Sequence, residues 1–149
     1  MIALACDHGG FELMADIKKY LESVACDYKD FGTFSPESCD YPVIAAPAIK
    51  AIVGKDCDNG IFICGTGIGM SIAANKTPGI RAALCTNRYM AEMTRSHNDA
   101  NVLVLGGRVT DTDSAIEIVK AFLSTSFSEK EKHRRRVAML NELDKLRKE

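Results

Sequence analysis

Residues 60–69 read GIFICGTGIG, a short apolar run (GIFIC, 60–64) followed directly by a glycine-rich loop, and this stretch decides the fold. An apolar run of this length, without alternating polar residues, is typical of a strand buried on both faces of a parallel sheet. The apolar spacing that begins near Met70 predicts a helix immediately after the loop. Strand, loop and helix in this order indicate one unit of a parallel α/β sheet.

The same alternation of apolar runs and helical patterns continues through the rest of the chain. Four further strands are predicted, at residues 2–6, 28–31, 81–85 and 102–105. Further helices are predicted over residues 11–24, 42–53, 87–97, 112–124 and 129–149. These elements predict a Rossmann-like three-layer α/β/α sandwich around a five-stranded parallel sheet. The 149 residues are expected to form one domain, 1–149.

The predicted last helix is highly charged and carries a narrow apolar stripe. The stripe consists of residues that recur every three positions: Val137, Leu140, Leu143 and Leu146. We expect this helix to extend to a partner subunit, with the stripe against the partner chain.

The overall composition argues against several functional classes. The formal net charge is −1, so the chain has no basic field to hold nucleic acid or a membrane surface. No apolar stretch approaches the roughly 20 residues of a membrane span, and no signal-peptide pattern follows Met1, so a cytoplasmic location is expected. The six cysteines include no C-x-x-C pair and are expected to be reduced thiols.

The unusual polar residues follow three of the predicted strands directly. Asp7 and His8 follow the first strand, Cys64 and the glycine loop end the third, and Arg108 comes shortly after the fifth. In open α/β sheets, ligands bind beyond the carboxyl ends of the strands. We therefore expect these residues to form one site.

The glycine loop itself predicts an anion site. Gly65, Gly67 and Gly69 allow the backbone to approach a ligand closely and to direct N–H groups at an anion. A plain tight turn is the alternative. A dinucleotide site is disfavoured because the spacing is G-x-G-x-G and the next strand ends without an acidic residue. A P-loop is disfavoured because no Gly-Lys-Ser/Thr follows.

Cys64 is the candidate reactive thiol. It lies at a strand end and near a helix N-terminus, where loop N–H groups and the helix dipole are expected to stabilise a thiolate. A phosphatase-type cysteine would need Arg six residues later, and that position is Met70. For the other five cysteines, a role as a small core residue is the better interpretation.

Two of the three histidines and one basic cluster are further candidates. His8 follows a strand, where a structural role is equally compatible, and His97 lies in a polar run at a predicted helix end. The cluster at 132–136 (KHRRR) is by default a solvated or nucleic-acid-binding face. Phosphate capture is favoured, because the chain is not basic overall and Lys132 and Arg136 share one helix face.

Six blocks of the sequence, in order and at family spacing, resemble the type B ribose 5-phosphate isomerases of the ribose/galactose isomerase family. They cover nearly the whole chain: Cys6–Gly10, Asp40–Pro42, Ile63–Gly69, Ala73–Lys76, His97–Val102 and Gly106–Val109.

The resemblance implies a sugar-phosphate isomerase that interconverts ribose 5-phosphate and ribulose 5-phosphate through an enediolate, without metal or organic cofactor. It implies that Cys64 is the base that moves a proton between C2 and C1, while the loop N–H groups and Thr66 stabilise the enediolate. It further implies that His97 opens the furanose ring. The residues implied to bind the phosphate are His8, Arg108, Lys132 and Arg136. Those implied to bind the rest of the substrate are Asp7, Tyr41 and Asn98.

The resemblance also implies a homodimer, or a dimer of such dimers, with shared active sites. The second subunit would supply the His97–Asn98 region and the C-terminal basic residues. Two positions depart from relatives: Lys132 stands where many have Arg, which loses the planar fork, and Met70 stands where one branch has a Glu base.

Two other functions stay open at this stage. A hexose 6-phosphate, such as allose or galactose 6-phosphate, is an alternative substrate. A non-catalytic sugar-phosphate-binding module is an alternative from a different class, and damage at Cys64, Thr66 or His97 would be its expected sign. All three residues are intact.

Overall fold

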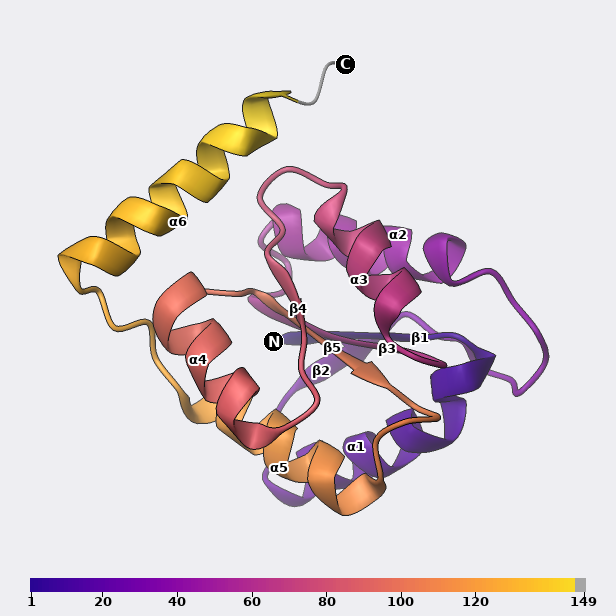
Figure 1. The fold of residues 1–149 in the computed structure, drawn as a ribbon. Coiled ribbons are helices and arrows are strands. Elements are labelled where there is room, and N and C mark those ends of the chain that lie inside the picture. Colours follow the sequence, from indigo (N-terminus) through magenta and orange to yellow (C-terminus); the bar gives the residue numbers. More distant parts are fainter. Residues whose placement is uncertain (147–149) are drawn as a thin grey trace.

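The computed structural model describes residues 1–146, which form a five-stranded sheet with helices on both faces (Figure 1). The strands are β1 (Ile2–Cys6), β2 (Tyr28–Asp30), β3 (Asn59–Cys64), β4 (Ala82–Leu84) and β5 (Val102–Gly106). Every neighbouring pair is parallel, in the order β2-β1-β3-β5-β4. The predicted three-layer sandwich is confirmed. Both outer strands are shorter than predicted.

The two faces of the sheet are covered by different helices, because successive strand residues point to opposite faces. Ile61 and Ile63 belong to a core with α1 (Phe11–Ser23), α4 (Arg88–Asn98) and α5 (Thr112–Ser124). The alternate residues Phe62 and Cys64 belong to a second core with α2 (Tyr41–Val53) and α3 (Ile68–Asn75). β1, β3 and β5 are therefore apolar along nearly their whole length.

Local capping sets several helix starts where the sequence predicted them. The Asn87 side chain accepts a hydrogen bond from Met90 N at 2.9 Å at the start of α4. Pro42 lies in the first turn of α2, where its missing N–H carries no penalty. α3 begins at Ile68, slightly before the predicted Met70, because Gly67 already serves as its N-cap.

The last helix, α6 (Glu131–Leu143), begins later than the predicted residue 129. Glu129 has a left-handed φ of 53° and Lys130 has a ψ of 141°, so neither continues a helix. A short 3₁₀ turn, η2 (Asp144–Leu146), follows, and residues 147–149 of the predicted helix lie outside the described residues.

α6 lies outside the three layers (Figure 1), and hydrogen bonds tie its C-terminal end to the body. Arg81 Nη1 donates to Asn141 Oδ1 at 3.1 Å, and Gly79 N donates to Asp144 Oδ2 at 2.8 Å. Val137 of the predicted stripe is buried in its own chain, whereas the rest of the stripe is exposed: Leu140, Leu143 and Leu146.

β4 forms one edge of the sheet and is held from outside by a side chain. The Asn75 amide at the end of α3 accepts from Ala82 N at 2.8 Å and donates to Ala82 O at 2.9 Å. Within residues 1–146, no helix is both long and apolar enough to cross a bilayer.

Candidate active site

The loops that follow β1, β3 and β5 converge at the carboxyl edge of the sheet. Backbone hydrogen bonds join them: Asp7 N donates to Ile63 O at 3.1 Å, and Gly107 N donates to Cys64 O at 2.8 Å. Arg108 N donates to Gly65 O at 2.9 Å. The structure therefore brings together the first group of predicted site residues, which lie in separate parts of the sequence.

Glycines allow this close packing of backbone on backbone. A Cβ atom added at Gly9 would lie 2.8 Å from Gly65 N, and one added at Gly107 would overlap the Gly9 carbonyl oxygen. A Cβ atom at Gly65 would lie 3.0 Å from Arg108 Nη1, so the guanidinium lies directly over the glycine loop. A positive charge thus faces the loop that was predicted to bind an anion.

The loop leads into α3 in a conformation that only glycine adopts easily. Gly67 has a φ of 81° and, as the N-cap, has no side chain with which to cap the helix. Thr66 is exposed, and its Oγ1 accepts from Ile68 N at 3.3 Å. The positive end of the α3 dipole is therefore directed to the loop, where it favours an anionic ligand.

Cys64 ends β3 below this loop, with 4% of its surface exposed. All six cysteines are free thiols. Burial raises the pKa of Cys6 to about 12 and that of Cys85 to about 11, so both are protonated near neutral pH. Cys64 is the thiol that adjoins the glycine loop.

Asp7 and His8 form the adjoining wall of the site. Asp7 is buried, and its Oδ1 accepts from Gly9 N at 2.8 Å at the start of the 3₁₀ turn η1 (His8–Gly10). His8 Nδ1 accepts from Cys39 N at 3.2 Å. Because Nδ1 is the acceptor, the neutral imidazole carries its proton on Nε2, which is then the ring's hydrogen-bond donor.

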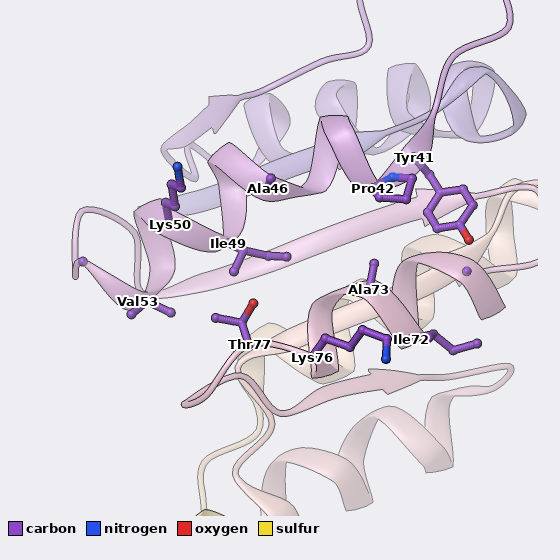
Figure 2. Close-up of a pocket in the computed structure, with 12 residues that line it drawn as sticks. Tyr41, Pro42, Ala46, Ile49, Lys50, Val53, Ile72, Ala73, Lys76 and Thr77 are labelled. Carbon is purple, nitrogen blue, oxygen red and sulfur yellow. The ribbon is translucent and has the colours of Figure 1, made fainter. Parts of the chain in front are cut away.

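Tyr41 is the first residue of α2. A Cβ atom at Gly69 would lie 2.6 Å from Tyr41 Cζ, so the ring packs on the start of α3. An apolar groove of about 680 Å³ between α2 and α3 begins at these two residues and ends at Val53 and Thr77 (Figure 2). Most of its lining is apolar, which suits apolar side chains, and Lys50 and Lys76 are its charged members.

His97 and Asn98 lie at the other end of the sheet. They end α4, and after a left-handed turn at Asp99 the chain enters β5 at Val102. Cys64 pairs with Gly106, four residues further along β5, which is about 13 Å at 3.3 Å per residue. Within one chain, the second group of predicted site residues is thus separated from Cys64.

This second group is extended by α6. The His133 ring lies against the His97 ring, with centroids 4.2 Å apart. Lys132 and Arg136, on either side of His133 in the sequence, are exposed. The two groups together hold every predicted site residue: Asp7, His8, Tyr41, Cys64, Gly65, Thr66, Gly67, Gly69 and Arg108 in the first, and His97, Asn98, Lys132 and Arg136 in the second. Their individual roles stay predictions.

Sequence reasoning missed two features of the second group. His133 was treated only as a member of the basic cluster, although its spacing of four from the apolar Val137 predicts one shared buried face. The Asp99 carboxylate is not free to bind a substrate, because it forms ion pairs with Arg81 at 3.2 Å and with Arg95 at 3.0 Å. No sequence signal identified Arg81 as its partner.

Within residues 1–146, no three His, Cys, Asp or Glu side chains are grouped so as to hold a metal ion. The site residues offer a thiol beside a glycine loop at a helix N-terminus, an imidazole and an arginine guanidinium.

Known proteins resemble the chain over nearly its whole length. A family model described as Ribose/Galactose Isomerase matches residues 2–140. Ribose-5-phosphate isomerase B of Escherichia coli is 43% identical over 146 residues, covering 98% of this chain and 97% of that protein. The 4-deoxy-4-sulfo-D-erythrose isomerase of a Clostridium species is 39% identical over 129 residues, covering 86% of this chain and 81% of that protein.

A solved structure of Clostridium thermocellum ribose-5-phosphate isomerase B superimposes with a TM-score of 0.95 at 48% identity, covering 97% of each chain. Fold, sequence and family model agree with the resemblance carried by the six sequence blocks. The chain belongs to the ribose/galactose isomerase family.

Proposed function

We propose that residues 1–149 form one isomerase domain that interconverts D-ribose 5-phosphate and D-ribulose 5-phosphate in the cytoplasm, as a step of pentose phosphate metabolism. The observation that carries the proposal is a thiol, Cys64, directly below a glycine loop that is covered by the Arg108 guanidinium. The similarity to ribose-5-phosphate isomerase B of Escherichia coli supports the choice of substrate.

In the proposed reaction, the Cys64 thiolate removes the proton from C2 of the open-chain aldose. The electrons of the broken C–H bond form a C1=C2 double bond, and the C1 carbonyl oxygen becomes the enediolate oxygen. N–H groups of the loop and the Thr66 hydroxyl stabilise that oxygen; loss of one such donor typically costs about 10²–10³ in rate. A proton passes from O2 to O1, the thiol returns its proton to C1, and C2 becomes the ketone.

We propose that the phosphate is held from both groups of residues. His8 donates from Nε2 and Arg108 contributes a bidentate guanidinium. Lys132 and Arg136 complete the binding, and Asn98 binds a sugar hydroxyl. Because these last three residues lie at the far end of the sheet from Cys64 in the same chain, they come from a second copy of the chain.

The proposed homodimer therefore has two sites, each built from both copies. The apolar groove between α2 and α3 adjoins the site at Tyr41 and Gly69. The exposed apolar side chains of α6, Leu140 and Leu143, match its chemistry. We infer that α6 of the second copy occupies this groove, and that His97 of the second copy then opens the furanose ring.

The test is an NMR assay with ribose 5-phosphate in D₂O and EDTA, which follows ketose formation and deuterium incorporation. Wild type is expected to form ribulose 5-phosphate, and Cys64→Ala is expected neither to isomerise the substrate nor to exchange its C2 proton. Cys57→Ala is the matched control, because Cys57 is equally buried but lies before β3, at the other end of the strand.

An inert wild type would refute the ribose assignment. Hexose 6-phosphates and 4-deoxy-4-sulfo-D-erythrose, the sugar named for the Clostridium relative, are then the next substrates to assay. Binding of these sugars without any turnover would instead favour a non-catalytic binding module.

A further inference from the structure

His133 is a buried histidine for which the proposed reaction has no role. It lies in the first turn of α6 with 4% of its surface exposed. Its ring faces that of His97, with centroids 4.2 Å apart and planes inclined by 32°. A polar side chain this deeply buried needs a hydrogen-bond partner, and Ser128 Oγ lies 2.6 Å from its Nδ1.

Ser128 connects this contact to the turn that carries His97. Its backbone N donates to Ser96 O at 3.0 Å, so the segment between α5 and α6 is attached to the last turn of α4. The His133 ring is thus held by the hydrogen bond to Ser128 and packs against the His97 ring. This packing restricts the orientation of the His97 ring.

We propose that His133 is a positioning residue, whose ring, anchored by Ser128, orients the His97 imidazole for the proton transfer that opens the furanose ring. The inference rests on the proposed function, in which His97 opens that ring. Misplacement of a reacting group by about 1 Å can lower the rate about 10²-fold, so loss of the His133 contact with His97 is expected to have a measurable effect on the rate.

The surrounding charges support an uncharged role for His133. Burial lowers the pKa of His133, and His97 together with the nearby cations of Lys130, Lys132 and Arg136 lowers it further. His133 is therefore neutral near neutral pH. It offers His97 an uncharged ring, so that a proton on His97 does not meet a second imidazolium.

Substrate chemistry separates ring opening from the later proton transfer. Ribose 5-phosphate is largely a closed furanose that must be opened before C2 can react. Ribulose 5-phosphate carries its phosphate on O5, the oxygen that would close a furanose on C2, and so is already open. Deuterium exchange at C1 of ribulose 5-phosphate therefore needs Cys64 and the loop but no ring opening.

The experiment measures both reactions in full-length variants. His133→Ala is expected to lower the turnover of ribose 5-phosphate about 10²-fold and to leave C1 exchange on ribulose 5-phosphate near wild type. His97→Asn is expected to give the same split, and His133→Ala in the His97→Asn background is expected to add no further loss. Ser128→Ala, which keeps the ring, is expected to show a smaller loss in the same direction.

Val137→Ala is the matched control, because Val137 lies one turn further along the same buried face of α6. It is expected to lower stability without separating the two reactions. Equal loss of both reactions in His133→Ala and Ser128→Ala, or additive losses in the double variant, would overturn the positioning role. A wild type that fails to convert ribose 5-phosphate would overturn the proposed function itself, so the two failures are distinguishable.

Discussion

Mixing two inactive variants tests whether one active site takes residues from two copies. In one chain, Cys64 is level with Gly106 at the end of β5, about 13 Å along the strand from Val102, whereas His97 lies on the segment that leads into Val102. In a mixed dimer of Cys64→Ala and His97→Asn, one site contains both mutations and the other contains neither. Half of the dimers are mixed after random pairing of equal amounts, so about a quarter of wild-type activity should return.

The assay is ribulose 5-phosphate formation after the two variants are unfolded together and refolded. The matched control pairs Cys64→Ala with Thr66→Ala, because both residues belong to the glycine-loop group. Every site of that mixed dimer lacks one of them, so no activity beyond the sum of the two variants is expected. The same absence of recovery with His97→Asn would show that each site is formed within one chain and would refute the reasoning.

Three further results are expected. Gly107→Ala forces a methyl group into the Gly9 carbonyl and should lower the free energy of unfolding, measured by urea unfolding, by about 1–3 kcal/mol. In the control Gly79→Ala, the added methyl group meets nothing within 4 Å, so only the strain of the left-handed φ lowers the stability. His133 binds its proton less readily in the folded chain than in the unfolded one, so the free energy of unfolding should fall as the pH drops below 6.5. In His133→Phe this fall should be less steep, and urea unfolding curves across the pH range measure both. Arg136→Ala, which would remove the proposed charged phosphate contact, should raise KM for ribose 5-phosphate about tenfold or more and change C1 exchange on saturating ribulose 5-phosphate much less.

The sheet was predictable because β1, β3 and β5 are apolar at nearly every position, a pattern that arises from burial on both faces. The start of α6 was not predictable, because the residue with the left-handed backbone, Glu129, is not a glycine and so gives no signal in the sequence. Among the predicted site residues, the topology of parallel sheets correctly predicted that those at the strand ends lie together. His133 was not predicted, because its importance depends on contacts with Ser128 and His97, which lie on other segments.

The Asn75 amide gives the β4 edge of the sheet a partner in place of a sixth strand. The outer strand of an open sheet offers unpaired N–H and C=O groups to any extended chain, which is a common start of aggregation. Ala82, the first residue of β4, has both of these groups already bound to one side chain. Since Asn75 ends α3, docking of that helix and protection of the edge occur in the same step. A chain caught before α3 docks would expose β4, and self-association should therefore be strongest from that intermediate.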